Sequence, residues 1–326
     1  MNHFGVLFRI SIYGESHGES LGIVMDGVPP GMPVSVEDFA EDLQRRKPGR
    51  TGTTQRREED LPHLMSGVFK GYTTGAPLHI QFQNKDARSR DYDQQLAFPR
   101  PGHADYVANK KYKGFQDYRG GGHFSGRMTL ALVAAGVVAK KILGPVRIQA
   151  RVSEAGGTQQ IDEAVAKAVE SGDSIGGLVS CSIDNVPVGW GEPFFNSIES
   201  VISHLVFSIP AIKGIEFGSG FASARMRGSE HNDALMDAEG KTLTNHAGGI
   251  NGGISNGNSI HFRVAVKPTS SIGKAQESLN TQTGQPEWFS IEGRHDACIA
   301  LRVPVVLEAV SAIALADFSL QFRGSE

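Results

Sequence analysis

The chain has 326 residues, of which 39% are hydrophobic and 21% charged, and its formal net charge is -3. This composition is typical of a globular protein and excludes a disordered chain, and the lack of overall basicity argues against a general nucleic-acid-binding protein. The two cysteines, Cys181 and Cys298, form no C-x-x-C pair. Neither a zinc ribbon nor a thioredoxin-like motif is therefore supported, and two thiols fit a reducing cytoplasm.

The N-terminus places Arg9 ahead of any apolar run of signal-peptide length, so we expect no signal peptide. The longest apolar stretches are residues 128–139 and 303–318. The first is too short to span a bilayer, and the second carries Glu308 and Asp317. We therefore expect both to be core helices of a cytoplasmic protein that does not bind membranes.

The first predicted element is an apolar strand at residues 5–12, which leads into the glycine-flanked turn GESHG at 14–18. Residues 35–46 carry apolar side chains at helical spacing, with Ser35 as the N-cap and Asp38 three residues later. This pattern predicts a helix that ends before Pro48, and a polar loop follows it.

Further along, three glycines lead into a long apolar helix that starts near Ser125 and ends near Lys141. A last helix is expected to start near Pro304. The remaining predicted elements are strands at 63–71, 76–83, 145–152, 176–184, 211–220 and within 248–271, and helices at 161–172 and 194–209. No repeat or polar linker interrupts this order, so we expect one interleaved domain over residues 1–326.

Basic residues gather at the end of the first predicted helix and in the loop that follows it. The cluster consists of Arg45, Arg46, Lys47, Arg50, Arg56 and Arg57. A solvated helix end, favoured by the helix dipole, would explain such a run without any function. However, arginine outnumbers lysine here, and guanidinium groups suit bidentate binding of phosphate or carboxylate. Arg100 and Arg119 also lie beside glycine or proline, which favours a site for a small polyanion.

Two glycine- or proline-marked loops have further anion-binding chemistry. Residues 119–127 place glycines before a helix N-terminus, where free backbone N–H groups can bind an anion. Residues 267–271, KPTSS, offer a cation and hydroxyl groups. Each signal is weak alone, and neither G-x-G-x-x-G nor G-x-x-x-x-G-K-[ST] occurs in the chain.

Three histidines, His17, His103 and His295, lie in similar loops, and Asp296 follows the last of them. No metal is predicted, because a close histidine pair with acidic companions is missing. A Ser-His-Asp hydrolase using Ser16 is also conceivable, since GESHG at 14–18 matches G-x-S-x-G, but this short pattern alone is a weak signal. The residues alone therefore favour an enzyme acting on a small phosphorylated acid.

Two alternatives stay open at this point. One is an enzyme of a different class that uses the same residues, such as a flavoprotein or a phosphate-ester lyase. The other is a non-enzymatic module that binds an anion or RNA, although the lack of aromatic residues within 45–57 argues against RNA.

Eight motifs in order closely resemble the chorismate synthase family, from the first strand to the last helix. They are GESHG (14–18), DGVPPGMP (26–33), TTQRRE (53–58), RPGHADY (100–106), DYRGGG (117–122), NHAGGINGGISNG (245–257), KPTSSI (267–272) and GRHDAC (293–298). The resemblance implies a lyase of the shikimate pathway, and thus of aromatic amino acid biosynthesis. This enzyme eliminates phosphate from 5-enolpyruvylshikimate 3-phosphate in a 1,4-anti sense.

The resemblance also implies the fold, the assembly and the cofactor. Family members are α+β proteins in which helices are sandwiched between antiparallel β-sheets, and they assemble as homotetramers. They need reduced FMN, although the reaction has no net redox change. Whether this chain reduces its own FMN with NADPH, or receives reduced flavin from a separate reductase, stays open.

Family resemblance assigns roles to individual residues. His17 would be the general acid for the departing phosphate, His103 would protonate the reduced flavin near N1, and Asp296 would keep flavin N5 able to accept the C6 hydrogen. Substrate or NADP contacts would come from Arg46, Arg50, Arg100 and Arg127. Flavin contacts would come from His123, Phe124, Ser125, Ala211, Gly252, Lys267, Pro268, Thr269, Ser270, Ser271 and Arg294.

The sequence departs from the family pattern at one of these motifs. Many members read GGRSSARET where residues 121–129 read GGHFSGRMT. His123 thus replaces a permanent cation, while Gly126 and Met128 replace alanine and glutamate. The loop after Pro48 is also one residue shorter than in many relatives, which bears on where Arg50 lies.

Overall fold

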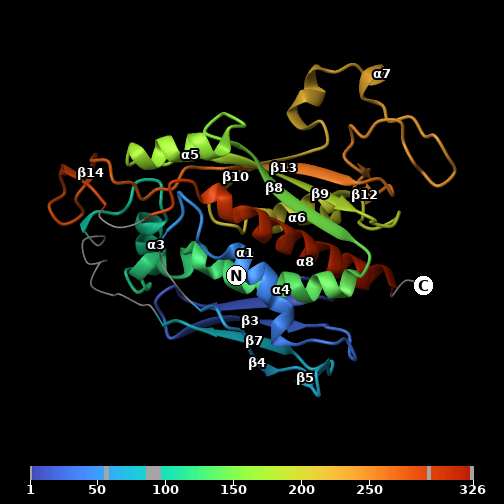
Figure 1. The fold of residues 1–326 in the computed structure, drawn as a ribbon, viewed down its shortest axis with the longest axis horizontal. Helices are drawn as coiled ribbons and strands as arrows, with labels where there is room; N and C mark the ends of the chain where they lie inside the picture. Colours follow the sequence, from blue (N-terminus) through green and yellow to red (C-terminus); the bar gives the residue numbers. More distant parts are fainter. Residues whose placement is uncertain (1, 55–58, 86–96, 292–294, 324–326) are drawn as a thin grey trace.

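The computed structural model describes residues 2–54, 59–85, 97–291 and 295–323. Two antiparallel sheets enclose a layer of helices (Figure 1). This arrangement confirms the predicted α+β sandwich.

The first sheet is built mainly from the N-terminal part of the chain. Its five strands lie in the order β1-β2-β3-β7-β4, and every neighbouring pair is antiparallel. The strands are β1 (His3–Phe4), β2 (Arg9–Gly14), β3 (Ser20–Asp26), β4 (His63–Ser66) and β7 (Leu78–Gln83). The GESHG turn joins β2 to β3, so the sheet holds both ends of this turn.

The second sheet contains four antiparallel strands in the order β10-β13-β9-β8. They are β8 (Arg147–Ala155), β9 (Gly177–Asp184), β10 (Ile212–Phe217) and β13 (Ile260–Val266). Apolar and polar residues alternate along these strands, because one face packs on the helix layer.

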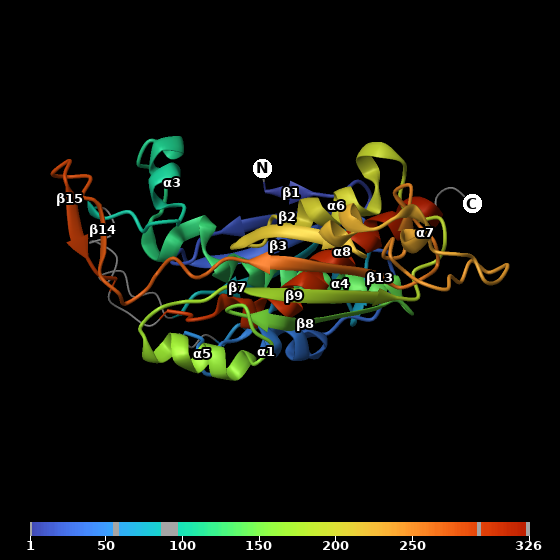
Figure 2. The same ribbon diagram turned by 90° about the horizontal axis from the view of Figure 1, so that it is seen from above.

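The helix layer is centred on α4 (Thr129–Leu143) and α8 (Val303–Arg323), which pack against each other between the two sheets (Figures 1 and 2). Both helices begin at the end of the sandwich where α3 and β14 lie. The other helices are α1 (Ala40–Arg46), α3 (Asp105–Tyr112), α5 (Ile161–Glu170), α6 (Ile198–Val206) and α7 (Gly228–His231).

The sequence patterns did not predict every element. The stretch at 63–71 is divided between β4 and the ribbon of β5 (Val68–Phe69) and β6 (Tyr72–Thr73). Strand β3 and helix α3 were not predicted, and neither were two ribbons, β11–β12 (Ile250–Asn251, Ile254–Ser255) and β14–β15 (Gln276–Leu279, Pro286–Phe289).

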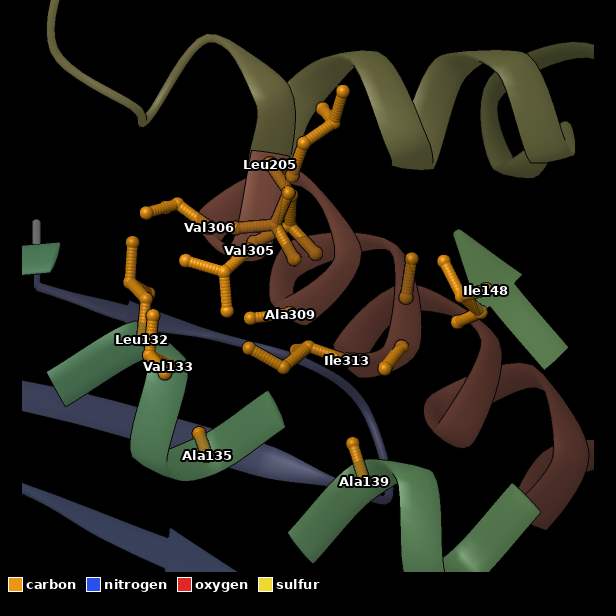
Figure 3. Close-up of a cluster of buried hydrophobic side chains, with 14 of the residues drawn as sticks. Leu132, Val133, Ala135, Ala139, Ile148, Leu205, Val305, Val306, Ala309 and Ile313 are labelled. Atoms are coloured by element: carbon orange, nitrogen blue, oxygen red, sulfur yellow. The ribbon is translucent and has the colours of Figure 1, made fainter. Parts of the chain in front are cut away.

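The core forms because α4 is apolar on all sides and is covered on all sides. Aliphatic residues of α4, α6, α8 and β8 interdigitate there (Figure 3). A Cβ atom on Gly136 of α4 would lie 2.4 Å from the Cβ of Ala309 on α8. The two helices therefore approach closely only because position 136 is glycine.

Among the described residues, one helix, Ile299–Phe322, is long and apolar enough to cross a membrane, and 78% of its apolar 18-residue stretch is buried inside the protein. The two acidic residues of this helix, Glu308 and Asp317, form hydrogen bonds within the protein. Glu308 accepts hydrogen bonds from Arg45, Lys140 and the Ala150 amide, while Asp317 accepts three from the backbone of residues 6–8. This helix is a core element, as the sequence predicted.

One hydrophobic cluster includes residues of both sheets and of the helix layer. That shared core supports a single domain over residues 1–326, which stays a prediction.

Candidate active site

The GESHG turn is buried at the end of the first sheet. Ser16 is fully buried, and His17 is nearly so. The Gly18 amide donates to the Glu15 carbonyl at 3.3 Å, which closes the turn, and the Ser16 amide donates to the Gly122 carbonyl at 3.1 Å. The turn is thus attached to the triple-glycine loop that precedes α4.

The triple-glycine loop contacts two of the predicted histidines. Gly120 and Gly121 have positive φ angles, at 58° and 82°. A Cβ atom on Gly120 would lie 2.2 Å from His17 Cε1, and one on Gly121 would lie 3.2 Å from His103 Cε1. Only glycine fits at position 120, and consecutive glycines bring the two imidazoles to one stretch of backbone.

His103 is oriented by a carboxylate two residues along the chain. Its Nδ1 lies 2.6 Å from Asp105 Oδ1, and Arg100 donates to both oxygens of Asp105 at 2.7 and 2.8 Å. Although burial opposes it, these hydrogen bonds hold the pKa of Asp105 well below its usual range. Asp105 is therefore ionised, the His103 Nδ1–H donates to it, and Nε2 faces Gly121.

The KPTSS loop lies against the same segment. Arg100 Nη1 is 3.5 Å from Ser271 Oγ, and Lys267 Nζ donates to Ser270 Oγ at 2.7 Å and to the Gly102 carbonyl at 3.0 Å. Burial, and secondarily the nearby Lys213, lowers the pKa of Lys267. The Lys267 amide also donates to the Ala211 carbonyl at 2.9 Å. Four residues expected to contact flavin thus lie together: Ala211, Lys267, Ser270 and Ser271.

A buried network of arginines forms the other side of the candidate site. Asp60 lies between Arg46 Nη2 at 3.3 Å and Arg127 Nη1 at 3.0 Å. Arg302 donates to Asp296 at 3.3 Å and to the Arg46 carbonyl at 3.3 Å. Among the described residues, the network holds three guanidinium groups and two carboxylates, which is a surplus of one positive charge.

Two consecutive arginines of α1 have opposite electrostatic environments. Hydrogen bonding to Glu308 raises the pKa of Arg45 above its ordinary value, although burial opposes this shift. Burial, with the charges of Arg302 and Arg127, instead lowers the pKa of Arg46 to about 10 against the opposing effect of Asp60. Within the described part of the chain, Arg46 Nε has no hydrogen-bond partner. The charge of Arg45 is therefore neutralised within the fold, whereas Arg46 must share its carboxylate, Asp60, with Arg127.

Four of the predicted contacts do not belong to this group of described residues. Arg50 is exposed, although its loop reaches Asp296 through the Thr54 amide at 2.8 Å. His123 Nδ1 lies 2.8 Å from the Gly14 carbonyl, so the imidazole contacts the first residue of the GESHG turn. Arg294, like Arg56 and Arg57 of the basic cluster, lies outside the described residues.

Gly252 is the fourth, and it lies between β11 and β12, far from the KPTSS loop. Ser255 of β12 accepts from the Gly189 amide, and a Cβ on Gly189 would touch Phe322 near the end of α8. Arg302 precedes the start of α8, whose 21 residues span about 30 Å. Gly252 is therefore at the opposite end of the sandwich.

Two surface hollows lie near these elements. One, of about 460 Å³, lies between α3, the 116–124 segment and the β14–β15 hairpin, and Phe124 is part of its wall. The other, of about 660 Å³, lies along α5 and includes none of the predicted site residues. The first adjoins the triple-glycine loop, so it is continuous with the candidate site.

Sequence reasoning did not single out four residues that organise this site, namely Asp60, Asn84, Asp105 and Arg302. The spacing of His103 and Asp105 was a usable signal, because a carboxylate near a loop histidine can orient its ring. Asp60 and Arg302 had no such signal, since their partners are distant in the sequence.

The sequence matches the family model of chorismate synthase over residues 8–320. A chorismate synthase from Chitinophaga pinensis is 62% identical over 321 residues, which cover 98% of this chain and 97% of that protein. Chorismate synthases from Dehalococcoides mccartyi and Korarchaeum cryptofilum are 41% and 43% identical, and each alignment covers at least 97% of both chains. These matches are long enough to show a common family.

A solved structure has the same fold. A crystal structure of chorismate synthase superposes with a TM-score of 0.77, at 27% identity, over 98% of this chain and 94% of the other. The sandwich is therefore the architecture of a chorismate synthase.

The contact between Gly120 and His17 can be tested with a matched pair of glycine variants. Gly120→Ala should lower turnover about 100-fold, because the new Cβ must displace His17 by roughly 1 Å. Gly114→Ala is the control: its φ of 81° gives the same left-handed strain, but its Cβ would meet only Asn109 Nδ2 at 3.9 Å. Turnover and thermal unfolding are measured for both. Equal turnover in the two variants would contradict the contact.

The contrast between Arg45 and Arg46 gives a second prediction. Arg46→Met should change the free energy of unfolding by less than about 1 kcal/mol, because it removes a disfavoured cation, and should abolish the stabilisation that inorganic phosphate gives the wild type. Arg45→Met should lower the free energy of unfolding by about 1–2 kcal/mol, because buried Glu308 then keeps only Lys140 and the Ala150 amide as partners, and should keep the phosphate response. Denaturant titrations with and without phosphate measure both effects. An undiminished phosphate response in Arg46→Met would refute the assignment.

Proposed function

The chain belongs to the chorismate synthase family, and from this premise we propose how its own residues carry out the family reaction. The reaction is the elimination of phosphate from 5-enolpyruvylshikimate 3-phosphate to give chorismate. The enzyme is a carbon–oxygen lyase of the shikimate pathway. Its substrate is a small molecule that carries a phosphate and two carboxylates.

The buried surplus of positive charge is the observation on which the proposed substrate site rests. Among the described residues, Arg46 and Arg127 share Asp60, Arg302 pairs with Asp296, and Arg46 Nε lacks a hydrogen-bond partner. An uncompensated buried cation is costly, so an anionic ligand is stabilised here. Arg46 and Arg127 would bind the substrate's anionic groups, and Arg50 and Arg100 would extend the site from the neighbouring loops.

His17 is proposed as the general acid. Negative charge develops on the phosphate as the carbon–oxygen bond breaks, and a protonated imidazole can donate to it. Burial of the GESHG turn excludes water from His17, and Gly120 leaves room for its ring. The arginine network beside the turn would hold the phosphate within reach.

The residues around KPTSS are suited to a flavin. Thr269 Oγ1 is buried and, among the described residues, has no hydrogen-bond partner, while Lys267 is partly desolvated next to it. A phosphate or polar ring edge would satisfy both. We therefore propose that Lys267, Pro268, Thr269, Ser270 and Ser271 hold FMN, with further contacts from Ala211, Phe124 and Ser125. When bound, reduced FMN supplies the electron-rich ring chemistry of the elimination.

His103 and Asp296 are proposed to act next to that cofactor. Asp105 holds the His103 Nδ1 proton, so Nε2 is free to present a second proton toward the flavin when the ring is charged. Asp296 is oriented by the Thr54 amide and by Arg302. His123 and Arg294 complete the proposed set of flavin contacts, although His123 reaches Gly14 in this structure.

NADPH is the proposed source of electrons, acting either at this protein or through a separate reductase. We also propose a cytoplasmic location. No described feature indicates nucleic acid as a partner.

The proposed function is tested by incubating the protein anaerobically with reduced FMN and the shikimate ester. Chorismate and phosphate should appear in equal amounts.

His17→Ala and Asp296→Asn should still bind FMN but lose turnover by about 10²–10⁴-fold, whereas His63→Ala, which changes an exposed histidine on β4, should retain wild-type turnover. If neither product forms with the wild type, the proposal fails, and wild-type turnover in His17→Ala would remove its acid role. Replacing reduced FMN with NADPH and oxidised FMN tells the two electron routes apart.

We further propose a homotetramer. Phe194, Phe195 and Phe221 are 86%, 91% and 80% exposed, which is unusual for phenylalanine on a free surface. Gly252, about one helix length from the KPTSS loop, would contact flavin only if a second subunit brought it there. Sedimentation equilibrium should give four times the 34.9 kDa chain mass, and Phe195→Asp should dissociate the assembly. A monomeric wild type would contradict this assembly.

A further inference from the structure

One amide side chain joins the His17 turn to the arginine network. Asn84 directly follows β7, and its backbone amide donates to the Glu19 carbonyl at 3.1 Å, which extends the β3–β7 ladder by one bond. The side chain then reaches the turn. Nδ2 lies 3.1 Å from the Glu15 carbonyl and 2.7 Å from the Gly18 carbonyl, and Oδ1 lies 2.6 Å from Arg127 Nε.

These three contacts use the bonding capacity of the amide in one orientation only. Nδ2 has two hydrogens, and it donates to the two carbonyls that flank Ser16 and His17. Oδ1 accepts from Arg127, which has no acceptor. A flipped amide would place its oxygen against two carbonyl oxygens and its N–H groups against a guanidinium. The orientation of Asn84 is therefore determined by its neighbours.

The contacts form a continuous path between the proposed substrate-binding arginines and the proposed acid. Arg46 and Arg127 share Asp60, Arg127 donates to Asn84, and Asn84 donates to both ends of the His17 turn. The links are hydrogen bonds and ion pairs between groups that are buried or half-buried, except that the bond to the Glu15 carbonyl is exposed. A change in the position of Arg127 is thereby transmitted to the turn.

The turn needs such an external support, because its own sequence does not hold it. Gly14, with a φ of 95°, and Gly18 flank it, and glycine leaves the backbone many conformations. Within the turn, the Gly18 amide reaches the Glu15 carbonyl at only 3.3 Å. Asn84 adds two hydrogen bonds to carbonyls on either side of His17, which restricts the position of its ring.

We propose that Asn84 is a positioning residue, which holds the His17 turn in register with the arginines that bind the substrate. This inference rests on the proposed function for the role of His17. Asparagine suits this task because it donates twice and accepts once. Aspartate keeps the contact with Arg127 but loses both donors and repels the carbonyls, and alanine loses all three contacts.

Asn84→Asp provides the test, because it changes the turn while keeping the link to Arg127. We expect kcat to fall about 100-fold, since His17 is displaced by roughly 1 Å, and KM to stay within about threefold. FMN binding should be unchanged, and the ¹⁵N NMR signals of the His17 imidazole should shift. Asn84→Ala should also lose kcat, and it replaces Asn84→Asp in the test if that variant does not fold.

The matched control is Asn185→Asp. Asn185 follows β9, at the end opposite Gly177, and its Nδ2 also donates to a backbone carbonyl, that of Pro145, at 3.1 Å. It should have wild-type kcat, KM and His17 signals.

Two results would overturn the proposal: a kcat within twofold of wild type, or a loss of kcat accompanied by weakened FMN binding and lower thermal stability, which indicates general damage. A wild-type protein without lyase activity would contradict the proposed function, and not the role of Asn84. In that case the His17 NMR signals still test Asn84, because unchanged signals in the variant exclude its contact with the turn.

Discussion

The candidate site depends on a buried carboxylate, Asp60, that two guanidinium groups share. Arg46 and Arg127 are both nearly inaccessible to water, so each would cost several kcal/mol to bury without a counter-charge. One carboxylate cannot neutralise both. Among the described residues, the network thus carries one positive charge more than its carboxylates balance, which favours an anionic ligand.

Holding like charges together requires a rigid frame, and the sandwich provides it at one end. The C-terminus of α1 carries Arg46, the residues before α4 carry Arg127, and the residues before α8 carry Asp296 and Arg302. The β2–β3 turn carries His17, and Asn84 directly follows β7. Because Gly136 and Ala309 let α4 and α8 pack in direct contact, the segments before the two helices also lie close together. Packing in the core therefore determines distances in the site.

The sequence predicted the types of groups in the site better than their connections. His17 and His103 stand out, because glycine or proline next to histidine marks a loop with reactive side chains. The sandwich was also predictable, through the family motifs and the all-apolar helix at 129–143. By contrast, Arg46 and Arg302 are 256 residues apart, and the pair Asn84–Arg127 is separated by 43. No periodicity or spacing encodes such pairs, because tertiary packing creates them. Gly252 shows a related limit, since its motif does not reveal that it lies at the opposite end of the sandwich from the KPTSS loop.

The neighbouring residues Arg45 and Arg46 show why residue type alone does not reveal function. Both are arginines at the end of one helix, and the basic run they belong to would ordinarily be a solvated helix end. A rotation of about 100° between consecutive helical residues directs one side chain toward Glu308 and the other toward Asp60. Glu308 accepts both terminal nitrogens of Arg45, so that charge is neutralised within the protein and stabilises the layers. Asp60 is already shared, so the charge of Arg46 remains available to a ligand. The difference between a structural and a ligand-binding arginine thus lies in its carboxylate partner. Glu308 binds both terminal nitrogens of Arg45, whereas Asp60 is divided between Arg46 and Arg127.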